Sequence, residues 1–271
     1  MDNEEIKYLV FDIESVPDAK LIKMAKYPDL DIDEKTAVIK FQEEILNNSG
    51  GTTFFIPVTF QYPISICMAK VRGDFSLVDI VSLDEPRFRT GEMTRLFWLG
   101  VEKTYNNSSL VSFNGRGFDI PLLELMAYRY GITARRHFKD KFASRYRFGT
   151  KHIDLQDWLS NYNAVRMAGG LNLLSKVIGK PGKMTTSGDD VYEMFLEGKI
   201  EEINNYCIHD VLDTYFVFLR TRVMLGELSV AKEEKVVKIA HDYIIEKSKS
   251  KPSLNEYLEH LSNSVPWPKD E

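Results

Sequence analysis

The sequence predicts an α/β protein built around a mixed β-sheet. Apolar runs rich in β-forming residues alternate with stretches whose apolar side chains recur at helical spacing. Some predicted strands follow one another through a short turn and others are separated by a helix, so both antiparallel and parallel pairing are expected. The 271 residues contain 44% hydrophobic and 28% charged side chains, which is typical of a globular protein with a large core.

The first strand is expected at residues 8–11, a short run of β-formers of the kind found in central strands. From residue 18 to about residue 57 the pattern changes. Residues 33–46 have apolar side chains near helical spacing, and residues 47–51 have the composition of a loop. We therefore interpret residues 18–57 as an insertion between the first two strands.

The next two apolar runs, residues 64–71 and 75–81, flank the sequence Arg72-Gly73-Asp74 and predict a β-hairpin. A helix, a buried strand and a second helix follow at residues 93–105, 110–113 and 120–130. Later helices are expected at residues 171–178, 191–196, 201–225, 230–248 and 254–261. We expect residues 1–225 to form one domain and residues 226–271 to form a helical extension packed on it.

Composition limits the compartment and the partners. Cys67 and Cys207 are the only cysteines, too few for a disulfide scaffold or a zinc ribbon, so we expect reduced thiols in a cytoplasmic protein. The first residues are acidic and no apolar run approaches the ~18 residues of a membrane helix, so neither a secretory signal nor a membrane partner is expected. The net charge is −5, so nucleic acid would have to be bound through local basic patches or metal ions.

Three groups of residues could carry chemistry. Asp12 and Glu14 follow the first predicted strand, and residues i and i+2 of a strand point to the same side, a spacing suited to adjacent divalent ions. Asp119 follows a later strand through Asn114-Gly115-Arg116-Gly117, at or next to a helix N-cap. Tyr206 and Asp210 share one face of helix 201–225. Considered singly, these acids are equally compatible with a polar strand end, a helix cap and a boundary pair.

In this order, the three groups resemble the DEDD exonuclease superfamily, tyrosine subclass. Residues 114–121, NGRGFDIP, resemble the second motif of the proofreading 3′–5′ exonuclease domain of family B DNA polymerases. The chain is most similar to stand-alone predicted exonucleases related to that domain, over roughly residues 6–225. The histidine subclass would have histidine where Asn205 stands. His209 is a helical neighbour of Asp210 and is expected to point away from the site.

The resemblance implies a ribonuclease H-like fold and two divalent ions, Mg²⁺ or Mn²⁺. It implies that Asp12 bridges both ions, that Glu14 and Asp210 complete the ion that activates water, and that Asp119 holds the second ion. Tyr206 would hydrogen-bond the attacking water. Hard carboxylate oxygens select these ions over zinc, and two ions about 3.5–4 Å apart can stabilise an in-line displacement at phosphorus.

Residues 135–151 carry seven basic side chains against one acid, with four aromatic rings among them. Cations that follow a backbone and rings that stack bases suit a single strand, although a solvated loop would have the same composition. Phe118 is compatible with a core position or with a contact to the terminal base. The residues expected to bind nucleic acid are Asn114, Phe118, Arg145, Arg147 and Lys151.

The predicted function is metal-dependent hydrolysis of phosphodiester bonds at the 3′ end of single-stranded nucleic acid, with DNA favoured over RNA and nucleoside 5′-monophosphates as products. A polymerase or repair factor could be a partner in trans, because no polymerase domain accompanies these motifs. The alternative is a nucleic-acid-binding module that keeps the fold and has lost catalysis. The presence of all four acids and the tyrosine favours the enzyme.

Overall fold

The computed structural model describes residues 5–184, 188 and 190–264. Its strands form one five-stranded sheet with the order β3-β2-β1-β4-β5. β1, β2 and β3 pair antiparallel, whereas β4 and β5 run parallel to β1. The predicted mixed sheet and its hairpin are therefore confirmed. The strands are β1 (Ile6–Pro17), β2 (Gln61–Arg72), β3 (Leu77–Ser82), β4 (Ser109–Ser112) and β5 (His152–Asp154).

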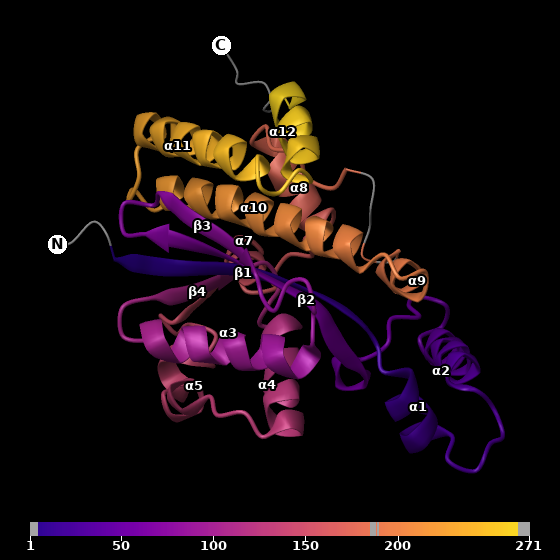
Figure 1. Cartoon of the computed structure of the whole chain (residues 1–271). Helices are drawn as coiled ribbons and strands as arrows, with labels where there is room; N and C mark the ends of the chain where they lie inside the picture. The colour runs from indigo at the N-terminus through magenta and orange to yellow at the C-terminus, as the bar shows by residue number, and fades with distance from the viewer. Residues whose placement is uncertain (1–4, 185–187, 189, 265–271) are drawn as a thin grey trace.

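Helices cover both faces of the sheet (Figure 1). Alternating side chains of β1 explain the two layers, because Val10 packs into the core on one face and Phe11 into the core on the other. The first face carries α8 (Gly170–Val177), α10 (Ile200–Met224), α11 (Val230–Ser248) and α12 (Leu254–Asn263). The second face carries α3 (Thr90–Thr104) and α4 (Asp119–Tyr130). Each of these helices coincides closely with a predicted one.

β1 is longer than predicted. The apolar run predicted a strand at residues 8–11 with the two acids at its end, whereas the strand continues through Asp12 and Glu14 to Pro17. Ile13 remains buried between the two acids, on the opposite face. Polar side chains on one face of a strand therefore do not end it when the other face still contributes to the core.

The insertion, residues 18–57, lies at one end of the molecule (Figure 1). Helices α1 (Ala19–Lys26) and α2 (Glu34–Asn48) pack on each other around a small core of their own, and η1 (Val58–Phe60) leads back to β2. Helix α2 was predicted, whereas α1, which has only eight residues, was missed. Its first turn is capped by Asp18, which accepts a 3.0 Å hydrogen bond from the Leu21 backbone N–H.

Short helices fill the rest of the chain. The basic segment folds into α5 (Arg135–Lys139) and α6 (Lys141–Ser144), and α9 (Val191–Leu196) lies beside the insertion, where Tyr192 packs on its core. Helix α7 (Leu155–Leu159) begins after Asp154, which accepts hydrogen bonds from the first backbone N–H groups of the helix. In the described part of the chain, these short helices connect the larger elements and add no strand to the sheet.

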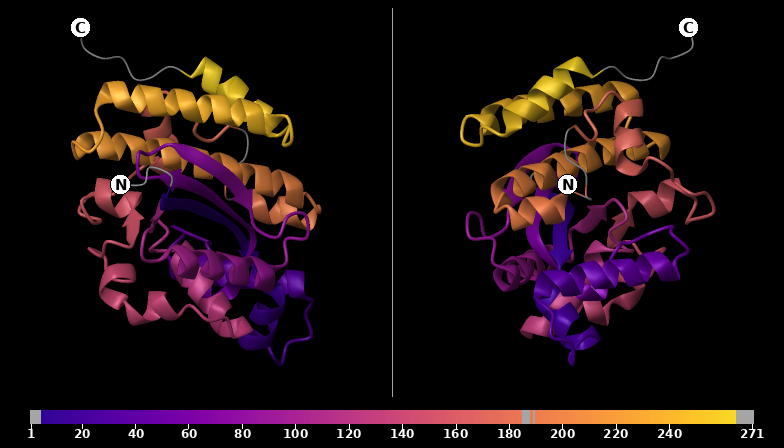
Figure 2. Two further views of the ribbon diagram at one scale, coloured as in Figure 1. Left: turned by 60° about the vertical axis from the view of Figure 1, so that its left-hand side comes forward. Right: turned by 90° about the vertical axis from the view of Figure 1, so that its right-hand side faces the viewer.

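The helices after Gly226 pack against α10 on the outside of the molecule (Figure 2). Gly226 follows α10 with a φ of 73°, which glycine adopts without strain, and so ends the helix where the sequence predicted. Residues from α10, α11 and α12 share one hydrophobic cluster. Residues 265–271 of the predicted extension lie outside the described residues. Within the described part of the chain, no helix has the length and apolar character needed to span a bilayer.

Candidate active site

Asp12 and Glu14 lie where one edge of β1 becomes accessible. β2 pairs with β1 along its length, including Asp12 opposite Cys67 and Glu14 opposite Ser65. In the described sheet, β4 pairs with β1 only as far as Val10. Beyond that point the edge of β1 borders a cavity of about 550 Å³ that both acids line.

Asp119 reaches the same cavity from the loop after β4. Asp154 holds this loop by accepting hydrogen bonds from the backbone N–H groups of Asn114 and Arg116, at 3.0 and 2.8 Å. A Cβ on Gly115 would lie only 2.9 Å from Asp119 Oδ2, so glycine allows the loop to pass close to this carboxylate. Asp119 is the first residue of α4, and it accepts a hydrogen bond from its own backbone N–H. The predicted junction is therefore present.

Tyr206 and Asp210 enter the cavity from α10, and the Tyr206 hydroxyl donates a hydrogen bond to the Asp210 carboxylate. Two contacts fix α10 against the sheet beside them. Ser65 Oγ donates to Asn204 Oδ1 at 2.9 Å, and Cys207 Sγ donates to the Asp12 carbonyl oxygen at 3.3 Å. The helix therefore presents its Tyr–Asp pair at a fixed height along β1.

The four carboxylates act on one another electrostatically. Burial, followed by repulsion from Asp210, Glu14 and Asp119, raises the pKa of Asp12 well above its usual range. The pKa of Glu14 is raised in the same way by burial, then by Asp210 and Asp119. Burial raises the pKa of Asp210 to about 6, although Lys183 and the Tyr206 hydroxyl oppose the shift. Burial, with Asp154 second, raises the pKa of Asp119 to about 8.

This charge balance fits divalent cations. A cleft that concentrates four acids around so little positive charge favours either protons or metal ions as counter-charges. One oxygen each of Asp12 and Glu14 lies within 4.8 Å of the other and of Cys207 Sγ. Asp119 and Asp210 face the cavity from outside this tight group. The oxygen donors suit Mg²⁺ or Mn²⁺.

Comparison with protein families matches residues 53–261 to the predicted 3′–5′ exonucleases related to the exonuclease domain of PolB. The chain belongs to this family. The resemblance inferred from the motifs is therefore confirmed at the level of the family. The match contains Asp119, Tyr206 and Asp210 and begins after Asp12 and Glu14, which the fold brings back to the same cavity. It also includes α11 and most of α12, which the motif resemblance left out.

Three solved structures that are similar to parts of the chain illustrate the comparison with known structures. The family B DNA polymerase of the hyperthermophilic archaeon Pyrobaculum calidifontis shares 14% identity at a TM-score of 0.47, covering 81% of this chain and 25% of the polymerase. Escherichia coli exonuclease I in complex with a dT13 oligonucleotide shares 13% identity at a TM-score of 0.37, covering 81% and 42%. The zinc-bound form of the same exonuclease with single-stranded DNA shares 13% at 0.36, covering 83% and 45%. This chain thus spans less than half of each. No curated protein matches the sequence significantly.

The cavity also includes residues that were not among the predicted site residues. Lys183 lines it and acts on Glu14 and Asp210, lowering the pKa of both. Phe54 and Phe55 of the insertion also line it, with 51% and 56% of their surface exposed, and the Phe55 ring lies 5.7 Å from that of Phe118. The signal in the sequence was a pair of adjacent aromatic residues in an otherwise polar loop.

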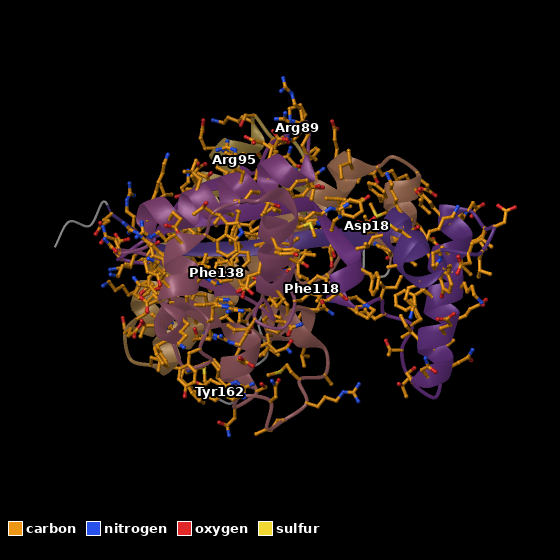
Figure 3. All side chains as sticks on the ribbon, turned by 90° about the horizontal axis from the view of Figure 1, so that it is seen from below. Asp18, Arg89, Arg95, Phe118, Phe138 and Tyr162 are labelled. Atoms are coloured by element: carbon orange, nitrogen blue, oxygen red, sulfur yellow. The ribbon has the colours of Figure 1, made fainter. Side chains whose placement is uncertain are left out.

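Of the predicted nucleic-acid contacts, Asn114 and Phe118 line the cavity, whereas the three basic residues do not. Arg145 pairs with Glu124 through two hydrogen bonds of 2.9 and 3.0 Å, and Arg147 lies 3.4 Å from Asp157. Lys151 donates to the backbone carbonyls of Asn106 and Ser108. Figure 3 shows Phe118 near the middle of the molecule and Phe138, from the basic segment, farther from the insertion.

His209 does not enter the 550 Å³ cavity. Its ring is buried and lies 5.3 Å from that of Tyr257, and burial lowers the pKa of the imidazole to about 4. The expectation that this helical neighbour of Asp210 points away from the carboxylate cluster agrees with its placement against α12.

Proposed function

We propose that this chain is a metal-dependent 3′–5′ exonuclease that removes nucleoside 5′-monophosphates from the end of a single strand, with DNA favoured over RNA. The observation that carries the proposal is that the acids and the tyrosine of the three motifs, which come from β1, α4 and α10, line one cavity. Membership of a family related to a DNA polymerase exonuclease domain supports both the reaction and DNA as the substrate.

The carboxylates would hold two divalent ions, Mg²⁺ or Mn²⁺. Asp12 would contact both, Glu14 and Asp210 would complete one, and Asp119 would hold the other. When bound, such ions would stabilise the attacking and leaving oxygens of an in-line displacement. The raised pKa values of the four acids support this assignment, since ionised carboxylates at this density need a counter-charge.

Tyr206 would position the attacking water and would not act as a base. Burial, followed by repulsion from Asp210, Glu14 and Asp12, raises the pKa of its hydroxyl far above the ordinary value. The phenol therefore stays protonated at neutral pH and donates a hydrogen bond. With substrate present, it would donate to the water while Asp210 remains ionised beside it.

Lys183 would favour the ionised form of the carboxylates in the cluster. Its ammonium group lowers the pKa of Glu14 and Asp210, so it favours the ionised carboxylates that bind metal. The side chain is exposed at the cavity, where it could also meet a phosphate oxygen. It therefore joins the proposed site as a positioning residue.

The terminal bases would stack on aromatic rings at the cavity. Phe55 and Phe118 lie with ring planes at 58°, and Phe54 lines the cavity beside them. Every base has a π-face, so stacking of this kind binds single strands without reading sequence. Asn114 would contact the same end of the strand, whereas Arg145, Arg147 and Lys151 would act only on nucleotides farther from it.

The test is digestion of a 3′-labelled single strand with Mg²⁺ or Mn²⁺. Asp12→Ala should reduce the rate by at least about a thousandfold, because it removes the proposed bridging ligand. Asp31→Asn, on an exposed loop of the insertion, should behave as wild type. Equal rates for Asp12→Ala and wild type would refute the role of Asp12. Binding of the strand without any digestion by wild type would favour the catalytically silent module.

A further inference from the structure

Cys207 lies beside the proposed metal ligands, although no motif includes it. It follows Tyr206 on α10, is fully buried, and points to β1, where its thiol contacts the Asp12 carbonyl oxygen at 3.3 Å. Its sulfur and one carboxylate oxygen each of Asp12 and Glu14 all lie within 4.8 Å of one another. Among the described residues, this is the one group of three such side chains close enough together to share an ion.

A sulfur ligand changes the ion that the group prefers. Thiolate is a soft ligand that selects Zn²⁺ or Cd²⁺, whereas Mg²⁺ and Mn²⁺ prefer oxygen. With Zn–S near 2.3 Å and Zn–O near 2.1 Å, a tetrahedral zinc ion separates its ligands by about 3.4–3.6 Å. The three ligand atoms lie within 4.8 Å of one another, so each distance between them would need to shorten by no more than about 1.4 Å. Side-chain rotation can supply a change of this size.

We propose that Asp12, Glu14 and Cys207 form a site for a thiophilic divalent ion, Zn²⁺ or Cd²⁺. On binding, the thiol releases its proton to solvent, its hydrogen bond to the Asp12 carbonyl breaks, and a metal–sulfur bond forms. Asp12 is partly exposed at the cavity, so the ion enters from that side. Because the ion occupies Asp12 and Glu14, it displaces the catalytic ions of the proposed nuclease and inhibits it. Only this inhibition rests on the proposed function.

Cys67 offers a matched control. It lies opposite Asp12 on β2 and is also fully buried. Its sulfur is directed to Ser82 and Asn204, at 3.6 and 3.3 Å, and it is not part of the three-residue group. Cys67→Ser therefore removes a thiol from the same core while leaving the proposed ligands in place.

The experiment measures Cd²⁺ binding through the ultraviolet absorption of the cadmium–thiolate bond. Wild type and Cys67→Ser should each develop this band with one equivalent of Cd²⁺, and Cys207→Ser should not. Loss of a residue that only orients a metal ligand lowers metal affinity about 10–100-fold. Loss of the Cys207 ligand itself should therefore lower the ratio of Zn²⁺ affinity to Mn²⁺ affinity, measured by calorimetry, by at least about tenfold in Cys207→Ser. An unchanged ratio, or a band lost only in Cys67→Ser, would overturn the proposal.

A second measurement needs no variant. X-ray absorption of the wild-type protein with one equivalent of Zn²⁺ counts the sulfur ligands directly. One sulfur supports the site, and none or two overturns it, even if Cys207→Ser fails to fold. These results are independent of nuclease activity, so they separate failure of this site from failure of the proposed function. If the protein digests DNA with Mn²⁺, Zn²⁺ should inhibit digestion in competition with Mn²⁺. Inhibition that appears only at Zn²⁺ concentrations as high as those at which Mg²⁺ is used would contradict the site.

Discussion

Gly115 places Asp119 in the cavity, and a single added methyl group should disturb it. A Cβ at this residue would lie 2.3 Å from Ser112 Oγ, 2.7 Å from Ser112 Cβ and 2.9 Å from Asp119 Oδ2. Favourable contacts between such atoms begin near 3.5 Å, so the overlap with Ser112 is about 1 Å. Ser112 cannot turn away easily, because its hydroxyl makes a 2.7 Å hydrogen bond with His152 Nε2. The loop that carries Asp119 must therefore move.

The size of the effect follows from these contacts. Overpacking costs about 1–3 kcal/mol, and a chain of this length loses about 2–4 °C of Tm for each kcal/mol. If Asp119 moves by about 1 Å, the rate of nucleotide release should fall about a hundredfold. Gly115→Ala is therefore expected to be far more harmful to activity than to stability.

The assay compares Gly115→Ala with Gly100→Ala by thermal unfolding and by release of nucleotides from a 3′-labelled strand. Gly100 lies within α3, and a Cβ there would meet no atom within 4 Å. This control should keep wild-type activity and gain up to about 1 kcal/mol from helix propensity. A Gly115→Ala protein whose rate is within twofold of wild type would refute the reasoning that the loop positions Asp119.

Three further substitutions test separate parts of the site. Tyr206→Phe should lower the rate about 10–100-fold while Mn²⁺ affinity measured by calorimetry is retained, and an unchanged rate would exclude a role in positioning water. Phe55→Ala should weaken binding of single-stranded DNA by about 1–3 kcal/mol for one lost stacking contact; equal affinity in a fluorescence titration would remove the insertion from the substrate path. Asp119 has a folded-state pKa of about 8, above its unfolded value, so the metal-free protein loses stability as pH rises toward 8. Between pH 6.5 and 8 the Asp119 carboxyl should account for about 1–2 kcal/mol of lost unfolding free energy. Denaturant titrations of Asp119→Asn should therefore show a loss over this range that is smaller than that of wild type by this amount, and an equal or larger loss would contradict the assignment.

Local rules predicted the parts of the site that depend on local geometry. Strand alternation placed Asp12 and Glu14 on one side, and helical spacing placed Tyr206 and Asp210 together. The position of the cavity could not be predicted in this way. It depends on where β4 stops pairing with β1, at Val10, which is set by contacts between segments about a hundred residues apart.

The basic segment shows a different limit of sequence reasoning. Counting charges along residues 135–151 gives a strongly positive stretch, but the count omits acids that come from elsewhere in the chain. Glu124 of α4 binds Arg145, and Asp157 of α7 binds Arg147. Charges already paired in this way attract a phosphate backbone less than the sequence suggests. The unexpected contribution came from the insertion, whose aromatic residues reach the cavity.

Cys207 shows why a core residue can matter to the chemistry of the site. On a helix, neighbouring residues point about 100° apart, so Tyr206 can face the cavity while Cys207 faces the sheet. Periodicity alone therefore assigns Cys207 to the core, and its full burial agrees. However, Cys207 packs against the segment of β1 that carries Asp12. The core and the carboxylate cluster share this segment of β1, so under the proposed thiophilic site a substitution chosen only for its packing at residue 207 should also change which metal ions the cluster binds.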